Sequence, residues 1–253
     1  MSLDATLIIT FLSAFTRCTA MVLASPLFGT NVPVKVRVLF CMVLSLALVP
    51  VLREHTTTVP QEMVGLFMLI GKDVVVGLVI GGMIQLLLAG FQIAGAFLDI
   101  QIGVAAAQIF SPMLGTTSSP ISQFKFLLGL VLLLIMDGHH FMFQAFVQSY
   151  EMVGPSLERL QEMQTTLISF MGQVSLMALQ IAAPVAAVSI VVDAAAGLVN
   201  KAVPQTQPFL LALPAKLIVC VFALAIGLPA MVVATRAGVD FTFSHMSKML
   251  GGP

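Results

Sequence analysis

Three groups of polar residues in otherwise apolar stretches are the candidates for chemistry in this chain. The tetrapeptide Asp137-Gly138-His139-His140 carries donor types that bind transition metals. Neighbouring positions on a helix do not face each other, and no HExxH pattern occurs, so we expect a turn or a buried hydrogen bond there and no metal site. The sequence also contains no paired nucleophile and base and no phosphate-binding loop. We therefore expect neither an enzyme nor a bound cofactor.

The second group is a polar stripe. Gln85, Gln92 and Asp99 recur every seventh residue, and Gln101 follows them. Because seven residues of an α-helix turn through about 700°, the first three share one face. Polar side chains in an apolar helix face the bundle interior or a wet cavity. The stripe predicts either hydrogen bonds between helices or the wall of an aqueous lumen.

The third group is centred on Asp193, which lies in an apolar run rich in small residues. An ionised carboxylate buried there needs a partner. Lys201, Lys216 or a residue of another chain could supply it. The pattern favours a structural ion pair, with a proton relay as the alternative.

The composition sets the class of protein in which these groups must work. The chain has 253 residues, of which 59% are hydrophobic and 9% charged, with zero net charge and a mean hydropathy of +1.07. Soluble domains carry about 25% charged residues. The sequence therefore predicts a polytopic, all-α integral membrane protein. It argues against a soluble enzyme and, having no basic patch, against a nucleic-acid partner.

The apolar runs are too long for simple spans. At 1.5 Å per residue, the run 64–98 would form a helix of roughly 52 Å, whereas the hydrocarbon core of a bilayer is roughly 30 Å thick. Either Gly81-Gly82 breaks this helix, or it projects beyond the bilayer under a cover of protein. Interfacial aromatic belts are also missing, because the chain has no Trp and one Tyr. That absence favours a surface facing protein, with compositional drift as the alternative.

Residues 100–124, between Asp99 and Lys125, carry no charge, yet they do not form one ordinary membrane helix. Pro112, Gly115 and Pro120 interrupt the segment. Irregular backbone at membrane depth is tolerated only inside protein or beside a water-filled cavity. The sequence therefore predicts an enclosed loop and a candidate pore element.

Six short motifs, in their order along the chain, resemble the FliR/SctT family of type III export-gate subunits. Arg17 precedes PLFGTNVPVKVRV, and the QxG element follows at Gln101-Ile102-Gly103. Ser111 stands where the family has Asp. The later matching elements are Phe110-x-Pro112, Gly138-His139, Ala183-Pro184-Val185, Asp193, Gly197, Pro204-Gln205, Pro214 and Lys216.

The resemblance implies an assembly. Residues 1–160 would be a FliP-like helical part that includes a plug loop at 100–124, and residues 161–253 a FliQ-like helical hairpin. One copy would complete a helical hetero-oligomer with FliP and FliQ around the path of unfolded flagellar export substrates. FlhB would wrap the cytoplasmic side and FlhA would lie below. The expected location is the bacterial inner membrane, in the flagellar basal body.

The resemblance also implies that the loop closes the lumen as a plug. The residues carried over to this role are Gly103, Phe110, Ser111, Pro112, Met113 and Gly115. Replacement of the family Asp by Ser111 removes a charge that an ionic latch would use. The alternative function is a polytopic small-molecule transporter with a substrate site at the broken helix 112–120.

Overall fold

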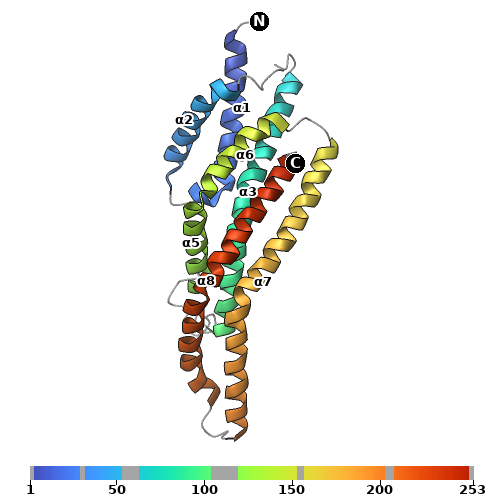
Figure 1. Cartoon of the computed structure of the whole chain (residues 1–253). Helices are drawn as coiled ribbons and strands as arrows, with labels where there is room; N and C mark the ends of the chain where they lie inside the picture. Colours follow the sequence, from blue (N-terminus) through green and yellow to red (C-terminus); the bar gives the residue numbers. More distant parts are fainter. Residues whose placement is uncertain are drawn as a thin grey trace. The chain divides into compact units, whose positions relative to one another are not determined.

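The computed structural model describes residues 3–28, 32–52, 63–103, 119–152, 157–202 and 208–250. Within these ranges the chain forms helices and no strand (Figure 1). The elements are α1 (Leu3–Ala24), the short 3₁₀-helix η1 (Pro26–Phe28), α2 (Val34–Leu52), α3 (Met63–Ile102), α5 (Pro120–Ile135), α6 (Gly138–Met152), α7 (Leu157–Ala202) and α8 (Pro208–Leu250).

Five of these helices contain stretches that are long and apolar enough to cross a membrane, and α5 with α6 adds a sixth if the two form one broken span. The stretches are Thr6–Ala24, Val34–Leu52, Met63–Ile102, Gln164–Ala202 and Leu213–Ser247. The predicted fold class, an all-α integral membrane protein, is confirmed. Assembly into a hetero-oligomer stays a prediction.

The long apolar runs form single helices. Helix α3 has 40 residues and continues through Gly81-Gly82, so these glycines do not break it. Helix α7 has 46 residues and continues through Pro184. At 1.5 Å per residue these helices are roughly 60 and 69 Å long, about twice the thickness of a bilayer core. The break at Gly81-Gly82 predicted as one explanation for run 64–98 is therefore wrong, and projection beyond the bilayer stays a prediction.

The chain divides into two compact units. The first comprises Met1–Leu87, Asp137–Phe170 and Asp240–Pro253, and the second comprises Leu88–Met136 and Met171–Val239. These units are not the predicted parts 1–160 and 161–253, because each takes segments from both. The predicted division concerns likeness to FliP and FliQ and stays a prediction.

In the first unit, two glycines let α3 approach α1 closely. A Cβ on Gly77 would collide with the carbonyl oxygen of Arg17 and lie 2.8 Å from the Cβ of Ala20. A Cβ on Gly81 would collide with the carbonyl oxygen of Met21 and lie 2.9 Å from the Cβ of Ala24. Small residues allow this kind of backbone contact between membrane helices.

In the second unit, glycines again mark the close contacts. A Cβ on Gly90 of α3 would lie 2.7 Å from Cγ1 of Val174 on α7. A Cβ on Gly129 of α5 would lie 2.9 Å from the ring of Phe91. The buried face of α5 consists of Ser122, Lys125, Gly129 and Leu133.

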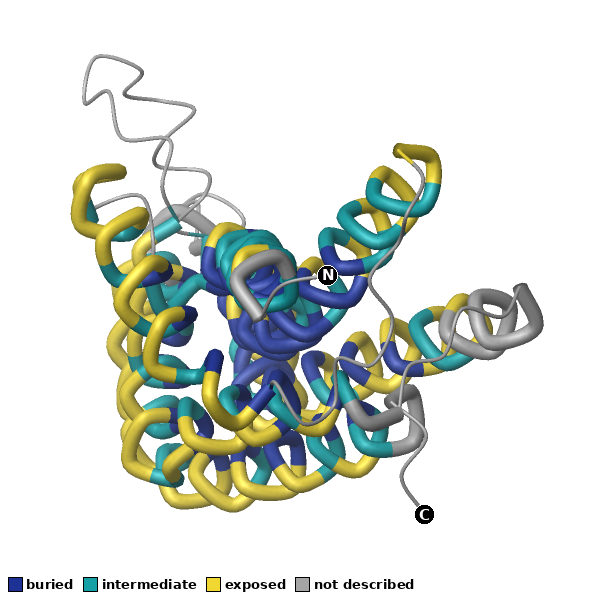
Figure 2. Tube along the Cα trace, turned by 90° about the horizontal axis from the view of Figure 1, so that it is seen from above, coloured by how far each residue is buried: buried dark blue, intermediate teal, exposed yellow. Residues whose placement is uncertain are grey.

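Many large apolar side chains remain exposed. Figure 2 shows in yellow where exposed residues lie along the helices. Only 11% of an 18-residue apolar stretch within Leu213–Ser247 is buried, and 17% of one within Val34–Leu52. The exposed large apolar side chains on α2 are Val34, Val36, Val38, Leu39, Met42, Val43, Leu46 and Val51. Such faces need lipid or other protein subunits to cover them.

The glycine contacts give a stability prediction for the detergent-purified chain. Gly77→Ala should lower the free energy of unfolding by about 1–3 kcal/mol, because the added methyl group has no room against the Arg17 carbonyl and Ala20. Gly82→Ala is the matched control on the same helix, since a Cβ there meets nothing within 4 Å. That control should be neutral or stabilising by up to about 1 kcal/mol. Thermal unfolding followed by circular dichroism measures both, and equal midpoints for the two variants would contradict the close packing.

Candidate functional site

The predicted plug lies between the end of α3 and the start of α5. Gly103 is described, whereas Phe110, Ser111, Pro112, Met113 and Gly115 lie outside the described residues. The structure therefore shows how the two ends of segment 104–118 are held. We call the residues that hold these ends, Gln92, Gly95, Asp99, Gly103 and Ser122, the loop frame.

The first end of the segment follows a glycine stop of α3. Gly103 has φ +93°, a left-handed conformation that side chains with a Cβ rarely adopt. Its N–H donates to the carbonyl of Ile100 over 3.2 Å. This is the behaviour of a glycine that terminates a helix. The chain therefore leaves the helical direction at Gly103.

The second end is capped by a side chain of α3. Ser119 precedes α5 but makes no side-chain capping bond, and Pro120 starts the helix. The Asp99 carboxylate, only 1% exposed, instead accepts the N–H of Ile121 at 3.3 Å and of Ser122 at 3.0 Å. A carboxylate at a helix N-terminus satisfies free amides and interacts favourably with the helix dipole. Asp99 thus ties the start of α5 to the end of α3.

Two further contacts strengthen this junction. The hydroxyl of Ser122 donates to the carbonyl of Gln92 over 2.8 Å. A Cβ on Gly95 would collide with the Cα of Ser122, so only glycine fits there at this spacing. Both ends of segment 104–118 are consequently attached to the last three turns of one helix, the first through Gly103 and the second through Asp99.

The polar stripe divides in the structure. Asp99 is buried in the loop frame, whereas Gln85 and Gln92 are exposed and Gln101 is half-buried. The carbonyl of Gln101 accepts the hydroxyl of Ser189 on α7 over 3.1 Å. Asp99 accordingly makes the predicted interhelical hydrogen bonds. A lumen-facing position for Gln85 and Gln92 stays a prediction.

Of the three ion-pair candidates, the structure brings two together. Lys216 Nζ on α8 lies 2.7 Å from both carboxylate oxygens of Asp193 on α7. The Lys216 side chain is 9% exposed and that of Asp193 is 42% exposed. Lys201 is exposed at the end of α7. The pair joins the two helices of the predicted hairpin, and the open side of Asp193 leaves room for a further donor.

Sequence reasoning missed the most deeply buried ion pair of the described residues. Arg17 on α1 and Asp73 on α3 form a salt bridge with side chains 3% and 2% exposed. Arg17 Nε lies 3.1 Å from Asp73 Oδ1, and Ser13 Oγ donates to Asp73 Oδ2 over 2.5 Å. From the sequence, Arg17 is recognised only as part of a family motif. The available signal was its charge, and that of Asp73, within apolar runs.

The same guanidinium reaches α6. Arg17 Nη1 donates to Ser149 Oγ over 2.6 Å, and its guanidinium carbon lies 3.6 Å from the centre of the Tyr150 ring. A cation above an aromatic face is attracted by the ring's quadrupole. One arginine therefore links α1, α3 and α6 in the first unit.

Comparison with known proteins identifies the family of this chain. The sequence profile of the bacterial export proteins, family 1, matches residues 8–240. The chain belongs to this family. As an export protein it is a membrane component of a protein-export apparatus and not an enzyme, which agrees with the sequence analysis.

Several named relatives are similar along most of their length. The flagellar biosynthetic protein FliR of Bacillus subtilis (strain 168) is 28% identical over 248 residues, covering 95% of this chain and 94% of the relative. FliR of Caulobacter vibrioides is 29% identical over 217 residues, 85% and 86% of the two chains. The surface presentation of antigens protein SpaR of Shigella sonnei is 23% identical over 160 residues, 63% and 62%. The resemblance drawn from the motifs is confirmed.

The buried pair of this export protein gives a second stability prediction. Arg17→Met should lower the free energy of unfolding by about 3–5 kcal/mol, because it leaves the Asp73 carboxylate buried without its counter-charge. Arg17→Met combined with Asp73→Leu should recover most of that loss, since no charge is then left unpaired. Thermal unfolding of the detergent-purified chain measures both.

Lys125→Met is the matched control for this prediction. Lys125 is fully buried, and within the described part of the chain its Nζ makes no hydrogen bond. Its removal strands no partner, so stability should be kept or raised. If Arg17→Met unfolds at the parent temperature, the pair does not stabilise the first unit.

Proposed function

We propose that this chain is the single-copy subunit that completes the flagellar type III export gate with FliP and FliQ, and that its segment 104–118 closes the channel as a plug. The observation that carries the plug is the loop frame. Asp99 and Gly103 fix both ends of the segment at one helix end, so the residues between them return to their starting place. A loop tethered in this way can occlude a lumen without leaving it.

The composition of the segment suits closure by bulk. Residues 104–118 carry no charge and include Phe110 and Met113, a large ring and a flexible side chain that fills irregular gaps. Pro112 and Gly115 disfavour helix within the segment. Because Ser111 replaces the family's Asp, we propose that closure here is steric and uses no ionic latch.

The exposed apolar faces support assembly with other subunits. Helices α3, α7 and α8 are longer than a bilayer is thick, so lipid alone leaves part of their apolar surface in contact with water. We propose that FliP and FliQ cover these faces, that FlhB and FlhA bind on the cytoplasmic side, and that unfolded flagellar proteins pass through the channel. The proposed location is the inner membrane, at the flagellar basal body.

Family membership separates this proposal from the transporter alternative. The family is described as bacterial export proteins, and the similar proteins are named flagellar biosynthetic proteins. Both names favour the export gate over a small-molecule transporter with a site at 112–120. Co-purification gives the direct test of membership in the gate. The tagged chain should bring down two different small membrane proteins, and recovery of the chain alone would contradict the assembly.

Deletion of residues 106–117 tests the plug separately. Cells carrying this variant should show a raised membrane conductance to small ions, because the channel loses its steric block. The double variant Phe110→Ala/Met113→Ala should leak in the same direction to a smaller extent.

The control uses the same residue types elsewhere. Phe67 and Met68 on α3 are 71% and 73% exposed, so Phe67→Ala/Met68→Ala removes equal bulk outside the segment. Gates that still assemble with this variant, as co-purification shows, should not leak. A deletion variant that still co-purifies with its partners but conducts no more than the parent would overturn the plug while leaving the gate assignment in place.

A further inference from the structure

A cluster of metal-binding donors lies at the turn between α5 and α6. One imidazole nitrogen from each of His139 and His140 and one carboxylate oxygen of Asp137 lie within 4.8 Å of one another. The two rings are neighbours in sequence, yet their centroids are only 4.2 Å apart. From the sequence, no site is predicted here, because adjacent positions in a helix interior diverge. In the structure, Asp137 lies in the turn and Gly138 is the first residue of α6. Both histidines therefore lie in the first turn of the helix and not in its interior.

The backbone of this turn directs the carboxylate toward the histidines. Asp137 has φ +57°, the left-handed region, which Asp adopts more readily than most residues. Its carbonyl accepts the N–H of His140 at 2.9 Å and so starts α6. Its carboxylate oxygen Oδ1 lies 3.2 Å from Nδ1 of His140. Two donors are therefore already about as far apart as neighbouring ligands of a tetrahedral zinc ion, roughly 3.3 Å for bonds near 2.0 Å.

The third donor residue has an unsatisfied nitrogen. His139 Nδ1 is buried, and within the described part of the chain it has no hydrogen-bond partner. A buried polar atom without a partner destabilises the fold unless something binds it. Neutral imidazole is the most common metal ligand of proteins. This unpartnered nitrogen is a second observation on a residue of the cluster, independent of the spacing between the donor atoms.

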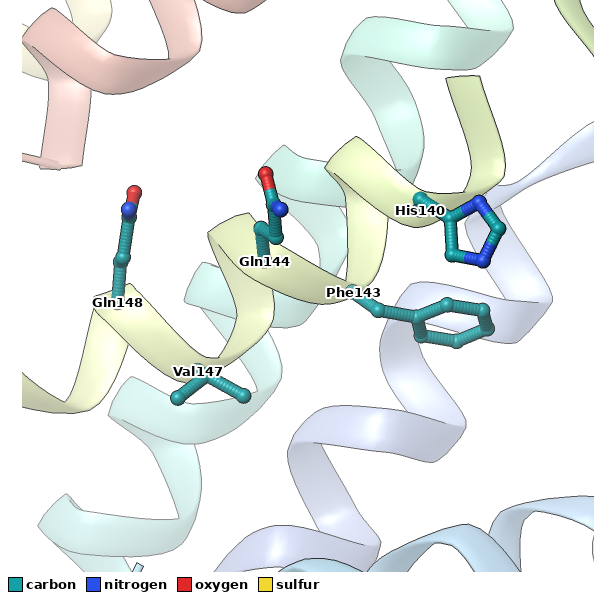
Figure 3. A pocket seen from close by; sticks show the side chains of 5 residues that line it. All are labelled: His140, Phe143, Gln144, Val147 and Gln148. Carbon is teal, nitrogen blue, oxygen red and sulfur yellow. The ribbon is translucent and has the colours of Figure 1, made fainter. Parts of the chain in front are cut away.

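The site is also open to ions from outside. The side chains of His140 and Asp137 are 66% and 68% exposed. His140 borders a hollow of about 530 Å³ on α6, lined by Phe143, Gln144, Val147 and Gln148 as well. Figure 3 shows the rings of His140 and Phe143 directed away from Gln144 and Gln148. An ion held by the cluster would keep a position free for water.

We propose that Asp137, His139 and His140 bind one divalent transition-metal ion, with Zn²⁺ as the best match. Two imidazoles and one carboxylate suit the borderline-soft first-row metals and not Mg²⁺ or Ca²⁺, which take oxygen ligands. The ion would fix the turn that begins α6 and satisfy the buried nitrogen of His139. The three ligands leave the fourth position to water. This site is separate from the loop frame and does not depend on the proposed plug.

Calorimetric titration of the full chain with Zn²⁺ tests the proposal. The protein carries no polyhistidine tag and is first stripped with a chelator. One equivalent of Zn²⁺ should bind, and Mg²⁺ should not compete. His140→Ala and Asp137→Asn alter exposed side chains, so they should fold normally. They should lose more than about a hundredfold in affinity, because removal of an outer partner alone typically costs about 10–100-fold.

His245→Ala is the matched control, because it removes an imidazole of the same unit outside the cluster, where its Nδ1 lies 3.1 Å from the carbonyl of Phe241. Its affinity should equal that of the parent. Co²⁺ offers a second readout, since a four-coordinate complex gives visible absorption that His140→Ala should abolish. Absence of saturable binding, or equal binding by parent and His140→Ala, would overturn the site and leave an exposed Asp–His pair.

Discussion

Two buried carboxylates on α3 are the groups on which the rest of the structure depends. Asp73 is neutralised by Arg17 and bonded by Ser13 in the first unit, and Asp99 accepts two amides of α5 in the second. A buried carboxylate at either place without a counter-charge or hydrogen-bond donors would cost several kcal/mol. Each carboxylate therefore favours packing of α3 against the helix that supplies its counter-charge or its hydrogen-bond donors. One helix of 40 residues organises α1 in one unit and α5 in the other.

The sequence predicted the helices better than it predicted their contacts. Hydropathy located the spans, and Pro112, Gly115 and Pro120 marked the interruption after Asp99. The Asp193 and Lys216 pair was among the predicted alternatives because both lie in apolar runs with few other charges. Arg17 and Asp73 were not paired in advance, since 55 residues lie between them and periodicity carries no information on which helices meet.

Other contacts of the site could not be predicted from the sequence because they depend on the local conformation of the backbone. Asp99 was assigned to a stripe with Gln85 and Gln92 because helical spacing puts them on one face, but its partners are backbone amides, which no residue type reveals. The histidines were set apart by a rule for helix interiors that does not apply at a helix start. The first end of the segment is set by Gly103, which ends α3 in a left-handed conformation that glycine adopts readily.

The central claim is that segment 104–118 lies in the path of exported proteins. Site-specific photo-cross-linking tests it most directly, with a photoreactive amino acid at position 110 in cells whose export substrate is stalled by a folded domain at its end. The account predicts a cross-link between position 110 and the substrate, and none from position 39, which lies on the exposed apolar face of α2. A substrate cross-link from position 39 and not from position 110 would contradict it.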